Sequence, residues 1–205
     1  FERSRALTTP AAVRRFIGPL ARKRALDGSV LSSVVPRMSR AWIAELRHAT
    51  GRKPVVVNHK LRLGVKIDYP KPATIGADRL ANACAAAERY GVPVIVADFG
   101  TAVTFDIISG EGAYVGGVIA PGLPLMTEYL YERTALLPMI HLKGPHGIVG
   151  RSTIEAMQLG AKVGYRGMVR EIVTFLQAGF HKRFKLCATG GFAEWALEGL
   201  KMPFT

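Results

Sequence analysis

Apolar residues follow two spacings along this chain, one typical of helices and one typical of strands. Apolar positions three and four apart predict helices over 10–25, 37–50, 80–90, about 122–135 and 152–178. Short apolar runs bounded by glycine or proline predict strands over 29–36, 53–58, 94–97, 103–108, 114–119 and 184–191. This alternation favours an α/β fold in which helices flank the sheets.

The segment 92–122 carries the most distinctive pattern. Its three strands are separated only by short turns, which predicts an antiparallel meander. We expect the first turn to be a tight hairpin formed by Asp98, Phe99, Gly100 and Thr101. A glycine lets backbone N–H groups approach a phosphate closely, a threonine hydroxyl can donate a hydrogen bond to it, and an aspartate can hold a cation nearby.

A loop over 64–79 interrupts the rhythm of helices and strands, because it contains two prolines and two glycines. It delivers the run Gly76-Ala77-Asp78-Arg79 to the start of the helix predicted at 80–90. The N–H groups of a first helical turn can bind an anion, and a rigid helix would hold the carboxylate of Asp78 and the guanidinium of Arg79 in fixed places.

Two later segments also carry candidate binding residues. Ser152 and Glu155 have the spacing of a capping box, which places Thr153 in the first turn of a long helix. The strand predicted at 184–191 ends in a turn that contains Gly190 and Gly191. A glycine pair after a strand suits a nucleotide that packs close to the backbone.

Charge is distributed unevenly along the 205 residues. The chain has 28 Lys and Arg against 15 Asp and Glu, a formal net charge of +13, and residues 1–66 alone carry a net charge of +12. Such a basic region suggests a nucleic-acid partner. The sequence has no helix-turn-helix, no aromatic RNA-binding pattern and no zinc motif, so we expect solvated helix faces and consider nucleic acid an improbable partner.

Other classes of protein are excluded by simple counts. No apolar run approaches the length of about 18 residues needed for a membrane-spanning helix, so no membrane association is expected. Two cysteines, Cys84 and Cys187, provide neither a disulfide framework nor a metal quartet, which fits packing residues in the reducing cytoplasm. The five histidines lack the spacing of metal ligands.

Taken in order, the motifs resemble the type III pantothenate kinase family of the acetate-and-sugar-kinase, Hsp70 and actin superfamily. The resemblance extends over nearly the whole chain and is densest from Tyr69 to Gly191. Its motifs are Gly76-Ala77-Asp78-Arg79, Asp98-Phe99-Gly100-Thr101-Ala102, Gly116-Gly117-x-Ile119-x-Pro121-Gly122, Thr134-Ala135-x-Leu137-Pro138, Gly150-x-Ser152-Thr153 and Thr189-Gly190-Gly191. Each motif alone is weak, but the ordered set is specific.

The resemblance implies two ribonuclease H-like (actin-like ATPase) subdomains with mixed sheets flanked by helices. Residues 1–91 would be the remainder of the N-terminal subdomain and residues 92–205 the C-terminal one. The family's phosphate-binding hairpin, Asp-x-Gly-Asn-Thr, has no match in residues 1–20, so the first subdomain is expected to be incomplete. A polypeptide that starts at Phe1 is therefore expected to bind ATP weakly or not at all.

The resemblance also implies a reaction, the ATP-dependent phosphorylation of pantothenate to 4'-phosphopantothenate, the first step of coenzyme A biosynthesis. Asp78 would be the general base. The substrate-binding residues would be Tyr69, Gly76, Ala77, Asp78, Arg79 and Thr153, and the ATP-binding residues would be Gly100, Thr101, Gly190 and Gly191. Asp98 would hold K⁺ or NH₄⁺, Mg²⁺ would accompany ATP, and the enzyme would be a cytoplasmic homodimer.

Simpler interpretations exist for each residue taken alone. Asp78 could be an ordinary acid favoured by the helix dipole, Asp98 a turn residue bonded to its own backbone, and Tyr69 a packing aromatic beside proline. Thr101 could only stabilise a hairpin, and a first-turn residue such as Thr153 is common in any helix. The ordered set of motifs favours the catalytic interpretation of Asp78.

Two rival functions remain open at this stage. The basic first third could belong to a nucleic-acid-binding regulator, because the family includes proteins described as accessory transcription factors. The missing hairpin could indicate a catalytically impaired member that acts as an accessory or transcriptional regulator or as an interaction subunit. Random duplex DNA binding without pantothenate-dependent ATP turnover would favour the regulator.

Overall fold

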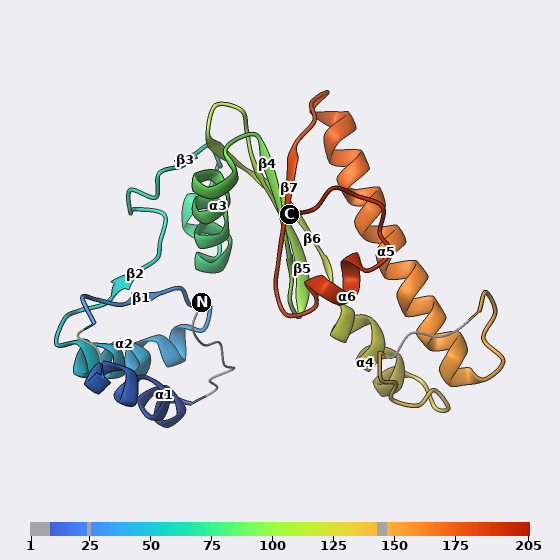
Figure 1. The fold of residues 1–205 in the computed structure, drawn as a ribbon, viewed down its shortest axis with the longest axis horizontal. Coiled ribbons are helices and arrows are strands. Elements are labelled where there is room, and N and C mark those ends of the chain that lie inside the picture. The colour runs from blue at the N-terminus through green and yellow to red at the C-terminus, as the bar shows by residue number, and fades with distance from the viewer. Residues whose placement is uncertain (1–8, 24–25, 143–146) are drawn as a thin grey trace. The chain divides into compact units, whose positions relative to one another are not determined.

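The computed structural model describes residues 9–23, 26–142 and 147–205 (Figure 1). Contacts between Cα atoms divide the chain into two compact units. Unit 1 comprises Phe1–Leu63 and Lys71–Ala81, and unit 2 comprises Gly64–Pro70 and Asn82–Thr205. The domain boundary expected after residue 91 stays a prediction, and each unit is described by itself.

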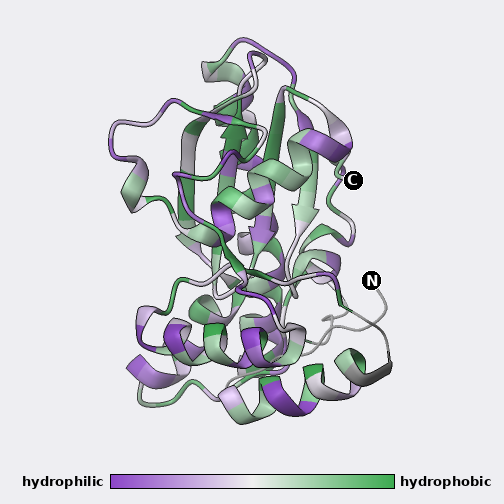
Figure 2. Cartoon of the chain, turned by 90° about the vertical axis from the view of Figure 1, so that its left-hand side faces the viewer, coloured by the Kyte–Doolittle hydropathy of each residue, from purple (hydrophilic) through white to green (hydrophobic). Residues whose placement is uncertain are grey.

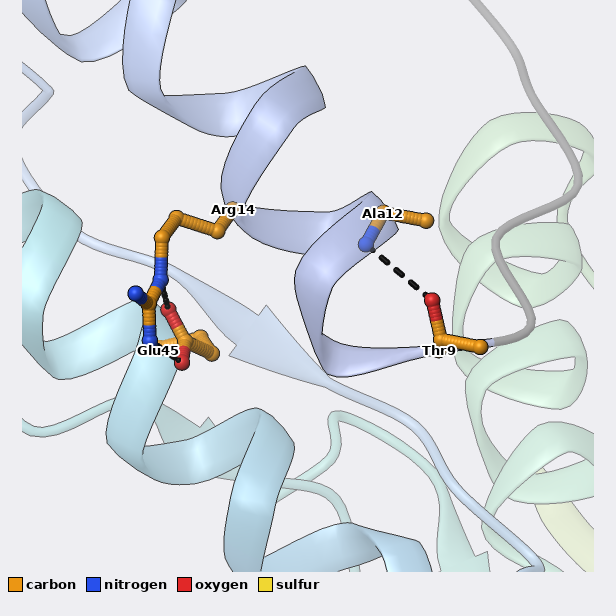
Figure 3. A network of polar contacts seen from close by, with 4 residues as sticks. All are labelled: Thr9, Ala12, Arg14 and Glu45. Atoms are coloured by element: carbon orange, nitrogen blue, oxygen red, sulfur yellow. Dashed lines mark hydrogen bonds and ion pairs between the residues drawn. The ribbon is translucent and has the colours of Figure 1, made fainter.

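Unit 1 is built around a pair of amphipathic helices, α1 (Pro10–Lys23) and α2 (Pro36–Thr50). Hydrophilic and hydrophobic residues alternate along both helices (Figure 2). The hydroxyl of Thr9 accepts a hydrogen bond from the N–H of Ala12 at 3.2 Å, which caps the start of α1. Arg14 of α1 donates two hydrogen bonds to Glu45 of α2, at 2.7 and 2.5 Å, and so joins the helices (Figure 3).

The strands of unit 1 are shorter than the sequence predicts. The runs 29–36 and 53–58 contribute only β1 (Val30–Leu31) and β2 (Val55–Val56), which pair in parallel. Val30 and Val55 are 67% and 51% exposed. A two-stranded sheet buries too little apolar surface to extend its strands, so the apolar runs leave the ladder after two residues.

The segment around 64–79 is more structured than the loop expected there. It contains β3 (Lys66–Ile67) and a 3₁₀ turn, η1 (Pro72–Thr74). Helix α3 spans Ala77–Tyr90 and so begins three residues before the predicted Leu80, which places Asp78 in its first turn. The N–H of Leu80 bonds the carbonyl of Gly76 at 3.2 Å, which accounts for the earlier start.

Unit 2 is organised by a five-stranded mixed sheet in the order β3-β6-β5-β4-β7. Its long strands are β4 (Val94–Phe99), β5 (Ala102–Ile108) and β6 (Ala113–Pro121), which form the predicted antiparallel meander. Strand β7 (Lys185–Thr189) returns parallel to β4, and β3 lies parallel to β6. The meander and the mixed α/β class are thus confirmed.

The hairpin predicted at Asp98–Thr101 is one detail in which the sequence interpretation is wrong. Asp98 and Phe99 are the last residues of β4, and the turn consists of Gly100 and Thr101. Asp98 is paired with Thr104 on one side and with Thr189 on the other, so the ladder on both sides extends the strand. The carboxylate of Asp98 is therefore fixed on a strand and not on a loop.

The two faces of this sheet have different partners. One face, with Ile95, Phe99 and Phe105, packs against Tyr165 and Val169 of helix α5 (Thr153–Gly179). Helix α4 (Leu123–Arg133) and the short helix α6 (Ala193–Leu197) complete that layer (Figure 1). Side chains alternate along a strand, so the other face carries Asp98, Thr104 and Asp106.

The start of α5 follows the predicted capping pattern. The hydroxyl of Ser152 accepts the N–H of Glu155 at 3.2 Å, and the Glu155 carboxylate accepts the N–H of Arg151 at 2.7 Å. Thr153 is the first helical residue, as expected. Among the described residues, no helix has the length and apolar character needed to cross a membrane.

Candidate functional site

The run Gly76-Ala77-Asp78-Arg79 forms the N-terminal turn of α3, within unit 1. Asp78 is exposed, and its Oδ1 accepts the N–H of Arg79 at 2.8 Å. A Cβ atom at position 76 would lie 2.4 Å from that same oxygen, so glycine leaves the space that the carboxylate occupies. The arrangement presents an ionisable oxygen to solvent on a rigid element, as a proton acceptor requires.

Asp98, in unit 2, is held at the end of β4 by a contact from α3. Its Oδ2 accepts a hydrogen bond from the Asn82 side-chain amide at 2.7 Å, and the residue is half-buried. Its other oxygen, Oδ1, would lie 2.6 Å from a Cβ placed on Gly190. Asp98 is therefore anchored through one oxygen, while the other lies beside the turn that follows β7.

Three turns meet at this end of the sheet, and we call them the turn cluster: Gly100 and Thr101 after β4, Gly122 before α4, and Gly190 and Gly191 after β7. The N–H of Gly122 donates to the carbonyl of Thr101 at 3.1 Å, and the N–H of Phe192 donates to the carbonyl of Phe99 at 3.1 Å. These bonds tie all three turns to the end of β4. Glycine-rich backbone at the start of a helix can bind phosphate groups.

Gly190 is the tightest point of the turn cluster. Its φ is +95°, a conformation that other residues rarely adopt. A Cβ there would lie 2.6 Å from both the nitrogen and the carbonyl carbon of Phe99. The neighbouring Gly191 has no atom within 4 Å of the corresponding position. Of the two predicted nucleotide-binding glycines, one is therefore required by the packing and the other faces open space.

Tyr69 lies over a different part of unit 2, beside strand β6. Its ring makes an edge contact with the ring of Tyr114, with 6.1 Å between centroids. A Cβ at Gly116, whose φ is +124°, would lie 3.4 Å from Tyr69 Cε2. Tyr69 is half-buried, so its ring is seated on β6 and still reaches solvent.

One residue of this region, Asp106, has no place in the sequence-based site. It is 0% exposed in the middle of β5 and accepts a hydrogen bond from the Tyr114 hydroxyl at 2.9 Å. The Thr104 hydroxyl approaches its other oxygen at 3.3 Å. The sequence did contain a signal for Asp106, an acidic residue inside a mostly apolar strand. Burying such a group is costly, so its presence indicates a specific partner or a function.

Thr153 lies away from Tyr69, on the side of the unit 2 sheet covered by α5. It is exposed at the first position of α5 and borders a groove of about 340 Å³ between α4 and α5. Leu130 and Leu137 line the groove from the α4 side, and Ala156 and Met157 line it from α5. The groove is mostly apolar, so Thr153 supplies a hydroxyl to an otherwise hydrophobic surface.

The structure thus sorts the predicted residues into groups. Asp98, Gly100, Thr101, Gly190 and Gly191 are brought together in or beside the turn cluster. Gly76, Ala77, Asp78 and Arg79 form the α3 start, while Tyr69 and Thr153 lie on opposite sides of the sheet in unit 2.

The remaining candidate chemistries are clustered metal ligands and reactive thiols. In the described ranges, no group of three or more His, Cys, Asp or Glu residues could hold a metal ion. Cys84 and Cys187 are free thiols. Burial raises the pKa of the Cys187 thiol, which disfavours the reactive thiolate and agrees with a packing role.

Known proteins of one family match most of this chain. The sequence profile of the type III pantothenate kinase family matches residues 3–174. A type III pantothenate kinase of Akkermansia muciniphila is 49% identical over 178 residues, which cover 85% of this chain and 71% of the relative. The corresponding protein of Acidiphilium cryptum is 44% identical over 181 residues, which cover 85% of this chain and 65% of the relative.

A third relative and a solved structure extend the comparison. The type III pantothenate kinase of Methylacidiphilum infernorum is 42% identical over 183 residues, 86% of this chain and 64% of its own length, so the chain spans about two thirds of these relatives. A crystal structure of a conserved putative Baf family transcriptional activator from Campylobacter jejuni superposes with a TM-score of 0.59 at 18% identity. It covers 94% of this chain and 79% of its own, and it supports the fold alone. The family profile and the curated relatives agree, and the chain belongs to the type III pantothenate kinase family.

Proposed function

We propose that this chain belongs to an enzyme that transfers the γ-phosphoryl group of ATP to the primary hydroxyl of pantothenate, forming 4'-phosphopantothenate. The enzyme would be a phosphotransferase with an alcohol acceptor and would catalyse the first step of coenzyme A biosynthesis. The observation that carries the proposal is the turn cluster, which gathers three glycine-containing turns around the Asp98 end of β4. Three curated relatives that share 42% to 49% identity with the chain have the same activity in their names.

The turn cluster suits the nucleotide for physical reasons. Phosphoryl transfer depends mainly on holding the phosphates in place and neutralising their charge. The exposed Thr101 hydroxyl and the open face at Gly191 are groups that a polyphosphate and its adenosine can approach. In this proposal Gly100, Thr101, Gly190 and Gly191 contact ATP.

The α3 start and Tyr69 would serve the acceptor. Asp78 would take the proton of the pantothenate hydroxyl as the new P–O bond forms, which is the role of a carboxylate in hydrogen-bond reach of the nucleophile. Arg79 would bind an anionic group, because guanidinium pairs well with carboxylate and phosphate. Tyr69 would contact pantothenate, and Gly76 would keep the space for the Asp78 carboxylate. Thr153 was also predicted to contact pantothenate, but it lies on the opposite side of the unit 2 sheet, so one chain alone does not bring it to the same pantothenate molecule as Tyr69.

The oxygen atoms around Asp98 fit a monovalent cation. Asp98 presents a carboxylate anchored by Asn82, and the carbonyl groups of Gly100 and Thr101 lie on the adjoining turn. Oxygen ligands are those that hard cations prefer. K⁺ or NH₄⁺ bound there would offset phosphate charge, and Mg²⁺ would arrive with ATP. In this proposal Asp98 and its neighbouring carbonyls hold the cation, and the backbone of the turns holds the phosphates.

We further propose a cytoplasmic homodimer. The surface beside the α4–α5 groove exposes apolar side chains, with Leu130 at 42%, Leu136 at 90% and Ile154 at 47% exposed. An exposed apolar surface of this kind favours association with another protein surface. A second copy of the chain is the partner that the family resemblance implies.

The reaction can be tested by coupled measurement of ADP release with and without pantothenate and K⁺. Release that requires both would support the proposal. The rival is an accessory regulator, favoured by the exposed arginines Arg37, Arg40 and Arg47 on α2. ADP release that does not depend on pantothenate, together with binding to random duplex DNA at physiological salt, would favour this rival and contradict the kinase proposal.

A further inference from the structure

The buried carboxylate of Asp106 is the least expected feature of unit 2. It lies at the centre of the sheet, on β5, and no part of it is exposed to solvent. Taking a charge out of water costs several kcal/mol unless hydrogen bonds replace the lost hydration. The neighbours of Asp106 along the strand, Phe105 and Ile107, are apolar, so a buried acid at this position calls for a specific reason.

One contact of Asp106 is with a second fully buried residue, Tyr114. The Tyr114 hydroxyl donates to Asp106 Oδ1 at 2.9 Å, and both residues are 0% exposed. Thr104 donates from the same strand to Oδ2 at 3.3 Å. A buried tyrosine hydroxyl that donates to a fixed carboxyl oxygen loses most of its freedom, so the hydrogen bond restricts the orientation of the Tyr114 ring.

The ring of Tyr114 in turn contacts Tyr69. The two rings meet edge to face, at 65° and 6.1 Å between centroids, which is a favoured aromatic geometry. A Cβ at Gly116, two residues after Tyr114, would lie 3.4 Å from Tyr69 Cε2, so glycine leaves room for the Tyr69 ring. A continuous set of contacts therefore runs from the buried carboxylate to a half-buried tyrosine that reaches the surface.

We propose that Asp106 is a positioning residue for the acceptor substrate: through the Tyr114 hydroxyl it fixes the Tyr114 ring, and through that ring it fixes Tyr69. The inference rests on the proposed function, in which Tyr69 contacts pantothenate. Asp106 and Tyr114 are buried and touch no substrate themselves. Their loss should therefore affect pantothenate binding more than turnover or ATP binding.

The first test follows Tyr69 without any substrate. The six tyrosines of the chain can be labelled with 3-fluorotyrosine, and the ¹⁹F resonance of Tyr69 assigned with Tyr69→Phe. We expect this resonance to move in Asp106→Asn and in Tyr114→Phe. Tyr165→Phe is the matched control, because it removes the hydroxyl of a tyrosine that is equally buried on the opposite face of the sheet.

The second test compares the kinetics of the same variants in the intact enzyme. Tyr114→Phe should raise the KM for pantothenate about threefold or more and leave kcat and the KM for ATP within about twofold. Asp106→Asn keeps an oxygen that can accept from Tyr114, so it should raise this KM less than Asp106→Val does. In a Tyr69→Ala background, Tyr114→Phe should have little further effect.

The outcomes separate this inference from the proposed function. An unmoved Tyr69 resonance in folded Asp106→Asn and Tyr114→Phe would overturn the inference alone. A moved resonance with an unchanged KM for pantothenate would also overturn it. A wild-type enzyme that does not phosphorylate pantothenate would overturn the proposed function and the substrate role of Tyr69 with it.

Discussion

Two tyrosines of unit 2 offer a direct comparison of a paired and an unpaired buried hydroxyl. Tyr114 and Tyr165 are both 0% exposed. The Tyr114 hydroxyl donates to the carboxylate of Asp106, whereas no described group accepts a hydrogen bond from the buried Tyr165 hydroxyl. Burial raises the pKa of Tyr165, and the Leu123 backbone opposes that rise as a smaller cause. The change Tyr→Phe removes the same oxygen atom at both positions.

The expected magnitudes differ because the partners differ. Tyr114→Phe removes the donor from a buried oxygen of Asp106, and the loss of one partner of a buried hydrogen bond costs about 1–3 kcal/mol, so this variant should lower the free energy of unfolding by roughly that amount. An unpaired buried hydroxyl carries a desolvation cost of about 1–3 kcal/mol, so Tyr165→Phe should leave stability unchanged or raise it. Both variants keep the same phenyl ring, so the contribution of ring burial largely cancels between them. The free energies of unfolding of the two variants should therefore differ by about 2 kcal/mol or more.

Urea unfolding at pH 7 measures both variants on the same scale. The midpoint for Tyr114→Phe should fall clearly below that of the wild type, and the midpoint for Tyr165→Phe should equal or exceed it, with similar slopes for all three proteins. Equal losses in the two variants, or a larger loss for Tyr165→Phe, would refute the assignment of the Asp106–Tyr114 bond as the difference between them.

Three further predictions concern stability. Gly190→Ala should lower the free energy of unfolding by about 2 kcal/mol or more, because its Cβ would meet the Phe99 backbone at 2.6 Å. Gly191→Ala should be nearly neutral, and urea unfolding of both variants measures the difference. The hydrogen bond from Arg14 lowers the pKa of Glu45 from its ordinary value of 4.5, so the pair stabilises the fold above pH 4.5 and this contribution is lost as the pH falls below that value. In urea unfolding, the free energy of unfolding of Glu45→Gln should be lower than that of the wild type at pH 7 and should converge with it in acid. Burial raises the pKa of Tyr165 to about 12, so the wild type should lose stability from about pH 10 towards pH 12, and Tyr165→Phe should lose less.

The sequence predicts the large sheet of unit 2 better than the small one of unit 1. The strands from Val94 to Pro121 are consecutive, apolar and joined by short turns, so local pattern and tertiary pairing agree. The runs 29–36 and 53–58 have the same apolar character, yet only two residues of each pair. Strand length there depends on the number of neighbouring strands, which periodicity does not report.

The site shows a similar division. Motif order indicated the turns at Gly100 and Gly190, and the structure packs them together. The sequence predicts Asp98 in a turn, whereas the structure places it on β4, because pairing with strands on both sides decides where β4 ends. Asp106 was missed because no motif contains it, and its importance depends on a hydrogen bond to Tyr114, eight residues away across a β-turn.

The proposed role of Asp78 as the base for phosphorylation of pantothenate is open to a direct comparison of variants. Pantothenate-dependent ADP release and pantothenate binding should be measured for the wild type, for Asp78→Asn and for Glu88→Gln, an exposed acid on the same helix. We predict that Asp78→Asn lowers kcat by about 10²- to 10⁴-fold and largely preserves binding, while Glu88→Gln behaves as the wild type. Near-normal turnover in Asp78→Asn would contradict the claim.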